Sequence, residues 1–86
     1  MAEINIFVKA DCPQCPRAKV FGNQLEEEGL VVNYCDLDTP TGLAKALKFR
    51  IKSLPTILII NSEGEETNRW GFVNFPNVDE VKNILK

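Results

Sequence analysis

Two cysteines three positions apart are the residues of this chain best suited to do chemistry. Cys12 and Cys15 follow the apolar segment 4–8 and open a stretch with helical spacing. On the first turn of a helix, residues i and i+3 lie on the same face, close enough for a short disulfide. The free N–H groups and the positive end of the helix dipole favour the thiolate, which is the nucleophilic form of cysteine. The spacing therefore predicts reversible disulfide chemistry at Cys12 and Cys15.

The same pair could instead bind a metal or form an inert structural staple. The chain has three cysteines and no histidine, so one molecule cannot assemble the usual tetrahedral zinc site from these two residue types. A metal would need a carboxylate, a second chain or an outside thiol. A staple that closes so short a loop removes little entropy from the unfolded chain. A CxxC pair in a βαβ setting is more typical of redox chemistry, and we expect no metal and no other cofactor.

Within the pair, we expect Cys12 to be the nucleophile, because it is the exposed, N-terminal member. Cys12 would attack a substrate disulfide, and Cys15 would then attack the mixed disulfide and release the reduced substrate. The intervening residues, Pro13 and Gln14, are candidates for substrate contact. Pro16 removes a backbone donor early in the helix, so we expect the regular helix to begin late.

Length and composition limit the possible functions. The 86 residues, 44% of them hydrophobic, suit one compact domain over residues 1–86. The formal charge of −2 arises from interleaved charges without a basic stripe, so nucleic acid is not an expected partner. The apolar run 4–8 is too short for a signal peptide or a membrane span, and an odd cysteine count suits a reducing compartment. We expect a cytoplasmic monomer that does not bind membranes.

The segments that position the cysteine pair alternate between strand and helix patterns. They predict four strands, near residues 3–8, 30–37, 57–60 and 67–72. They predict three helices: one that runs from the CxxC pair to about Gly29, one capped by Thr41 and one capped by Asn77. The connection before the fourth strand is too short for a crossover, so that strand should be antiparallel to the third. The order βαβαββα is that of an α/β fold.

With CxxC after the first strand, this order resembles the thioredoxin superfamily over nearly the whole chain. Residues 54–56, Leu-Pro-Thr, are similar to the thioredoxin segment that holds a cis-proline before the third strand. The resemblance implies a thioredoxin fold, with a four-stranded mixed sheet flanked by three helices and a cis Pro55 that faces CxxC. It also makes Leu54, Pro55 and Thr56 candidate substrate-binding residues. From the residues alone, a trans proline at the start of a strand is the alternative.

Departures from the thioredoxin pattern resemble the NrdH-redoxins. Thioredoxins carry a buried aspartate six residues before the first cysteine, where this chain has Ile6, and Tyr34 replaces the lysine that usually neighbours it. Gln14 gives the CxQC form of NrdH-redoxins. Residues 70–72, Trp-Gly-Phe, are similar to the Trp-Ser-Gly-Phe segment of those proteins, which makes Gly71 another candidate for substrate binding.

The resemblance also implies partners. NrdH-redoxins take electrons from a thioredoxin reductase, so a reductase of that type is expected, together with disulfide-containing protein substrates such as ribonucleotide reductase. Glutaredoxins bind glutathione partly through a Gly-Gly pair followed by an aspartate, whereas this chain has only Gly71, followed by Phe-Val-Asn. Three alternatives stay open: a glutathione-dependent glutaredoxin, an iron–sulfur carrier that uses a second chain and external thiols, and an interaction module without turnover.

The third cysteine and two aromatic residues allow more than one interpretation. Alternation along 30–37 places Cys35 on one face of its strand, which favours a small hydrophobe packed in the sheet over a regulatory or dimerising thiol. Trp70 and Phe72 could be core residues of the fourth strand or part of a substrate surface.

Overall fold

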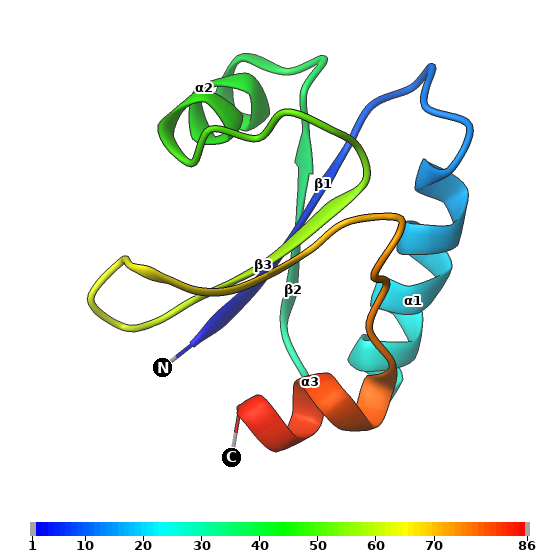
Figure 1. The fold of residues 1–86 in the computed structure, drawn as a ribbon, viewed down its shortest axis with the longest axis vertical. Helices are drawn as coiled ribbons and strands as arrows, with labels where there is room; N and C mark the ends of the chain where they lie inside the picture. Colours follow the sequence, from blue (N-terminus) through cyan, green and yellow to red (C-terminus); the bar gives the residue numbers. More distant parts are fainter. Residues whose placement is uncertain (1, 86) are drawn as a thin grey trace.

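Four strands and three helices follow one another in the predicted order in the computed structural model, which describes residues 2–85 (Figure 1). The strands are β1 (Glu3–Val8), β2 (Val32–Asp36), β3 (Thr56–Ile60) and β4 (Glu66–Trp70). The helices are α1 (Cys15–Glu27), α2 (Pro40–Lys48) and α3 (Val78–Ile84). The strand order in the sheet is β2-β1-β3-β4, with β1 parallel to β2 and the other neighbouring pairs antiparallel. The predicted four-stranded mixed sheet with three helices is confirmed.

The sheet separates two hydrophobic layers. Successive residues of a strand point to opposite faces, so Ile6 and Ile57 pack in one layer with α1 and α3, while Phe7 and Leu58 pack in the other with α2. Figure 1 shows α1 and α3 together on one side of the sheet and α2 on the other. All five residues of β3 are buried, as expected for a central strand covered on both faces.

Helix α1 begins later than the first cysteine. The expectation that both cysteines lie on its first turn is wrong, because Cys12 precedes the helix and its carbonyl accepts the N–H of Cys15 across a turn (3.3 Å). Cys12 comes directly before Pro13, and a following proline disfavours helical backbone angles. Pro16 lies in the first turn, where N–H groups have no helical partner, so the expected late start is confirmed. Gly29, with φ of +86°, follows the end of α1.

Side chains cap the other two helices. The cap of α2 is Thr39 rather than the predicted Thr41: its Oγ1 accepts the N–H of Gly42 (3.1 Å), and a proline at the first helical position continues from it. Asn77 caps α3 as predicted, since its Oδ1 accepts the N–H of Glu80 (2.8 Å). None of the helices between residues 2 and 85 has the length and apolar character needed to cross a membrane.

Candidate active site

The predicted disulfide pair lies on the turn that leads into α1. The sulfur atoms of Cys12 and Cys15 are bonded to each other, and their Cα atoms are 5.4 Å apart, within the range that a disulfide requires. The two residues differ in exposure, because Cys15 is only 1% exposed whereas Cys12 is half-buried. An attacking sulfur has to be reached by its substrate. The exposure therefore suits Cys12 as the nucleophile and Cys15 as the resolving thiol.

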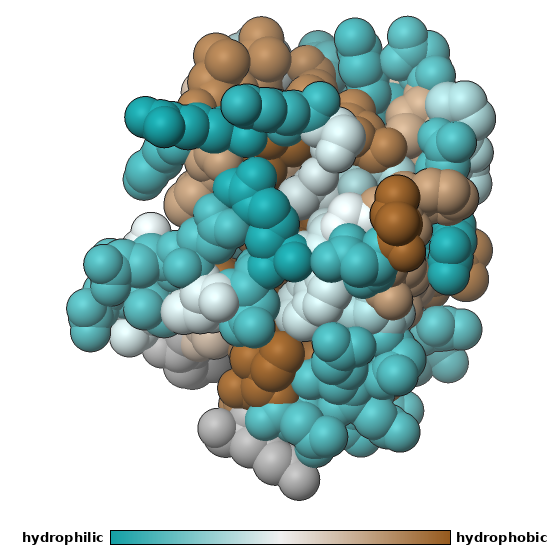
Figure 2. Space-filling view, in the orientation of Figure 1, coloured by the Kyte–Doolittle hydropathy of each residue, from teal (hydrophilic) through white to brown (hydrophobic). Residues whose placement is uncertain are grey.

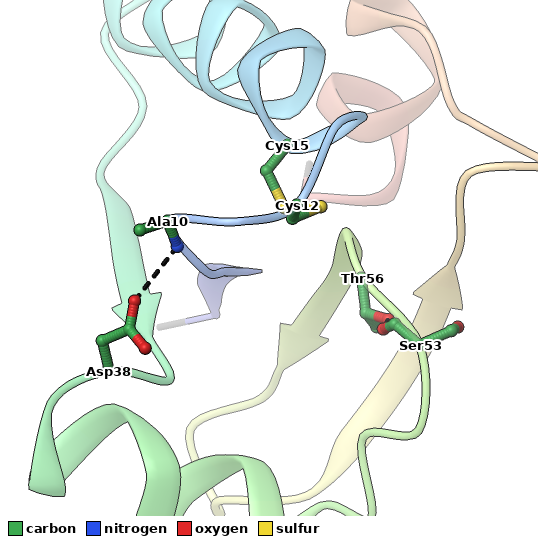
Figure 3. Close-up of a disulfide and its surroundings, with 6 residues drawn as sticks. All are labelled: Ala10, Cys12, Cys15, Asp38, Ser53 and Thr56. Carbon is green, nitrogen blue, oxygen red and sulfur yellow. Dashed lines mark hydrogen bonds between the residues drawn. A yellow bond between two sulfur atoms is a disulfide. The ribbon is translucent and has the colours of Figure 1, made fainter.

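Asp38 tethers the loop that precedes the disulfide (Figure 3). Its Oδ2 accepts the backbone N–H of Ala10 at 3.1 Å, across 28 positions of sequence. Its own backbone N–H donates to Asp36 Oδ1 (2.8 Å), which fixes the turn after β2. Asp38 is not among the site residues predicted from the sequence. The only local signal was a pair of aspartates between a strand and a helix, and nothing in that signal points to Ala10.

The turn 53–56 faces the disulfide from the other side (Figure 3). The peptide bond between Leu54 and Pro55 is cis, which confirms the prediction from the resemblance. Leu54 and Cys12 are both partly buried against the same hydrophobic layer, whereas Pro55 is fully buried. Thr56 is 4% exposed, and its hydroxyl donates to the carbonyl of Ser53 (2.6 Å). The Thr56 side chain therefore braces this turn, in which Ser53 is exposed and Leu54 is partly buried.

The segment after β4 separates the roles of its two aromatic residues. Strand β4 ends at Trp70 rather than near Phe72, because the N–H of Gly71 donates to Asn74 Oδ1 (2.7 Å). Trp70 belongs to the core at 7% exposure, and its indole N–H donates to Glu80 Oε2 (3.2 Å). Phe72 is 43% exposed. Of the two aromatic residues, only Phe72 is available to a partner.

The outer rim of the CxxC turn carries the other predicted contact residues. Pro13 and Gln14 are exposed. Close to them in sequence, the guanidinium of Arg17 lies 4.3 Å from the ring centroid of Phe75 and 5.7 Å from that of Phe72. These distances are those of cation–π contacts. They place an aromatic and cationic surface next to the start of α1.

The thioredoxin aspartate and lysine are replaced by a pair of strand neighbours. Ile6 is fully buried and lies beside Tyr34 in the sheet register. The Tyr34 hydroxyl is 3.1 Å from both Asn23 Oδ1 and Glu26 Oε1, and burial together with Glu26 raises the pKa of Tyr34 to about 12. Ile6 thus offers no proton acceptor to Cys15. Between residues 2 and 85, no three His, Cys, Asp or Glu side chains are grouped closely enough to hold a metal ion.

The third cysteine lies in the hydrophobic layer under α2. Cys35 is 7% exposed, is not disulfide-bonded, and packs with Phe7 and Leu58. Its sulfur is 3.7 Å from Asn5 Oδ1. Burial raises the pKa of the Cys35 thiol, although the charge of Lys45 acts in the opposite direction. The predicted packing role is confirmed.

A CxxC disulfide at the start of α1, a facing cis-proline and a β2-β1-β3-β4 sheet define a thioredoxin fold. Comparison with known proteins agrees. A curated relative described as a probable thioredoxin from Archaeoglobus fulgidus is 28% identical over 87 residues, which cover 100% of this chain and 88% of the relative. No family model matches the chain.

Solved structures match over almost the whole chain. A malaria-parasite thioredoxin-2, described as a component of the protein secretion machinery, matches with a TM-score of 0.80 at 22% identity. The matched region covers 99% of this chain and 81% of the parasite chain. The solution structure of a Thermus thermophilus thioredoxin has a TM-score of 0.67 at 26% identity, covering 98% and 71%. The predicted thioredoxin fold is confirmed. The curated relative and the Thermus thermophilus thioredoxin support thiol–disulfide oxidoreductase activity.

Proposed function

We propose that this chain reduces disulfides in proteins and carries electrons by cycling between the Cys12, Cys15 dithiol and their disulfide. The observation that carries the proposal is the asymmetry of the pair: a half-buried Cys12 faces the cis-proline turn, and a buried Cys15 lies behind it. A substrate chain that runs along Leu54 and Pro55 would bring its disulfide to Cys12.

The proposed cycle has two exchange steps. The Cys12 thiolate attacks one sulfur of the substrate disulfide; that S–S bond breaks, a mixed disulfide forms, and the other substrate sulfur leaves as a thiolate. Cys15 then gives up its proton and attacks Cys12 Sγ, so the mixed disulfide breaks and the second substrate sulfur is released. Two electrons pass from the pair to the substrate, and the two substrate thiolates take up two protons, one from Cys15 and one from the solvent that received the Cys12 proton. Because Ile6 replaces a buried carboxylate, the Cys15 proton goes to the departing substrate thiolate.

For the return of electrons, we propose a thioredoxin reductase-type enzyme, which would place the chain closer to NrdH-redoxins than to glutaredoxins. Gln14 supports this through the CxQC motif. The loop after β4 supports it too, since it lacks the second glycine and the aspartate of the glutathione signature. The N–H of Gly71 is already bonded to Asn74 Oδ1 (2.7 Å), so it is not free to bind a glutathione carboxylate.

Protein substrates suit the exposed apolar surface near the site. Val73 is 99% exposed and Phe72 is 43% exposed, on the loop that follows β4. Exposed apolar side chains that are grouped together favour a protein surface as partner. Disulfide-containing proteins in a reducing, cytoplasmic compartment, ribonucleotide reductase among them, are the substrates that we propose for a monomeric carrier.

The test compares two reductants on the oxidised protein. In a Cys35→Ala variant, Cys12 and Cys15 are the only cysteines, so every protein thiol released comes from their disulfide. The release of these thiols is followed over time with thioredoxin reductase and NADPH, or with millimolar glutathione. We expect the reductase to act faster and to show saturation, and a Cys12→Ser version should release no thiol pair. Efficient, saturable reduction by glutathione, with no response to any reductase tried, would overturn the proposed electron donor.

A further inference from the structure

A groove of about 500 Å³ opens beside the proposed substrate path. Ser53 and Thr56, which flank the cis-proline, line one part of it, and Gly71 and Asn74 on the loop after β4 line another. The groove therefore adjoins the turn that faces Cys12 (Figure 3). On the face seen in Figure 1, the chain between α2 and β3 runs above β4, and Figure 2 shows that the surface over β4 is mainly hydrophilic.

Three cationic side chains line this groove, Arg50, Lys52 and Arg69, and none of its lining residues within 2–85 is acidic. Arg69 is already neutralised, because its Nε and Nη2 each donate to the carboxylate of Glu66 at 2.7 Å. This hydrogen bonding lowers the pKa of Glu66, which keeps the carboxylate charged. Arg69 also donates to the carbonyl of Phe49, so it holds the chain between α2 and β3 against β4. Arg69 therefore has a structural role in shaping the groove.

Arg50 and Lys52 differ from Arg69 because their charges are not neutralised. Both are exposed, and neither forms an ion pair with a side chain of the described residues. The backbone of Arg50 has φ of +56°, in the left-handed region where glycine or asparagine costs less. This conformation ends α2, because the N–H of Arg50 donates to the carbonyl of Leu47 (3.2 Å) and the N–H of Ile51 donates to the carbonyl of Ala46 (2.9 Å).

We propose that this groove is a subsite for acidic residues on either side of the substrate's disulfide cysteine. This inference rests on the proposed function and names the substrate class of the same site. Arg50 and Lys52 would pair with the carboxylates of a substrate chain held along Leu54 and Pro55. Because these are exposed ion pairs, they would act mainly on encounter and binding, and salt would weaken them.

The test measures single-turnover reduction of two disulfide peptides by the reduced protein, so that no electron donor is involved. The peptides are identical except that glutamate or glutamine flanks each cysteine. The variant is Arg50→Asn combined with Lys52→Gln, since asparagine tolerates the left-handed backbone. Lys48→Gln, on α2, is the control, because Lys48 is exposed, forms no ion pair with a side chain of residues 2–85 and does not line the groove. Glutathione disulfide is added as a third substrate, because it also carries carboxylates.

We expect the wild-type protein to reduce the glutamate peptide about fivefold faster than the glutamine peptide, the effect of two exposed ion pairs. The preference should vanish in the double variant and in high salt, but persist in Lys48→Gln. The glutamine peptide should react equally in all three proteins, which shows that they are folded. Equal wild-type rates on the two peptides, or a preference that survives in the double variant, would overturn the inference. So would a variant that slows only glutathione disulfide.

The outcome also separates this inference from the function on which it rests. If the glutamine peptide is reduced, and reduction requires Cys12, the proposed function stands whichever way the glutamate preference falls. If neither peptide is reduced by the wild-type protein, the proposed function fails.

Discussion

The cysteines on the two faces of the sheet differ in their surroundings. On the α1 face, Cys12 and Cys15 lie at the end of the layer, on a turn between the cis-proline segment and the Asp38 tether. On the α2 face, Cys35 is enclosed within the layer by Phe7 and neighbouring aliphatic side chains. The residue type is the same, so position decides reactivity: a thiol at the open end of a layer can exchange, and a thiol inside it stays protonated and inert.

The α2 face is also the more polar of the two. Asn5 is fully buried there, and its Oδ1 accepts from Lys45 Nζ at 2.6 Å. Its Nδ2 has no hydrogen-bond partner among residues 2–85, which costs stability. Lys45 in turn lies 3.8 Å from Glu3. These polar groups lie around Cys35, on the face of the sheet opposite to the disulfide. We therefore expect substitutions on this face to change the free energy of unfolding more than the rate of disulfide reduction.

The largest effect is expected at the disulfide itself. Cys12→Ser should abolish disulfide reduction, because no other sulfur is positioned to attack the substrate. Cys15→Ser keeps the nucleophile but removes the resolving step, so it should accumulate mixed disulfides through Cys12, detectable by mass spectrometry. Turnover in Cys12→Ser together with its loss in Cys15→Ser would reverse the assigned roles.

A strong effect on stability alone is expected from Gly42→Ala. An added Cβ at Gly42 would overlap the backbone of Asp36, including its carbonyl oxygen, so α2 would have to shift from β2. Overpacking of this kind should lower the free energy of unfolding by about 3 kcal/mol, measured by denaturant titration. Gly71→Ala is the matched control, because its Cβ would approach nothing closer than Asn74 Oδ1 at 3.7 Å. Equal stability of the two variants would show that α2 is not closely fitted to β2.

Loss of the hydrogen bond between Asp38 and Ala10 should have an intermediate effect. Asp38→Ala leaves the N–H of Ala10 without its acceptor and loosens the loop before Cys12. We expect single-turnover reduction to slow by roughly fivefold, while the free energy of unfolding falls by less than about 1 kcal/mol. Asp38→Asn keeps an acceptor oxygen and should restore most of the rate. An unchanged rate in Asp38→Ala would mean that the loop holds its position without this bond.

The smallest effect is expected at Cys35. Cys35→Ala should retain turnover and lose about 1 kcal/mol of stability. Burial raises the thiol pKa above its ordinary value of 9.0, so the protonated form stabilises the fold below about pH 9, and this contribution is lost as pH rises through the folded-state pKa. The stability difference between wild type and Cys35→Ala should therefore be constant below about pH 9 and shrink above it. A difference that grows above pH 9 would contradict a raised pKa.

The features that could be predicted from the sequence are those that local patterns encode. Apolar periodicity indicates the strands and helices, the spacing of Cys12 and Cys15 indicates their disulfide, and the segment around Pro55 resembles a known cis-proline turn. Small errors came from local competition between patterns: α2 is capped by Thr39 rather than Thr41, because both can accept a backbone N–H and only Thr39 is followed by a helix-starting proline.

Features that depend on contacts between distant segments could not be predicted. Asp38 meets Ala10 across 28 positions, and Arg69 meets the carbonyl of Phe49 across 20. The groove beside the active site exists because such contacts bring the α2–β3 connection and β4 together. Gly42 is similar, since its lack of a side chain matters only where α2 meets β2. No spacing rule within one segment contains this information.

The contrast between the two faces is tested most directly by competitive alkylation of the reduced, folded protein at neutral pH, with each cysteine quantified by mass spectrometry over time. The account predicts that the half-buried Cys12 is labelled first, and that the two buried thiols, Cys15 and Cys35, are both labelled much more slowly. Adding denaturant should bring the three rates together. Labelling of Cys35 as fast as that of Cys12 in the folded protein would contradict the account.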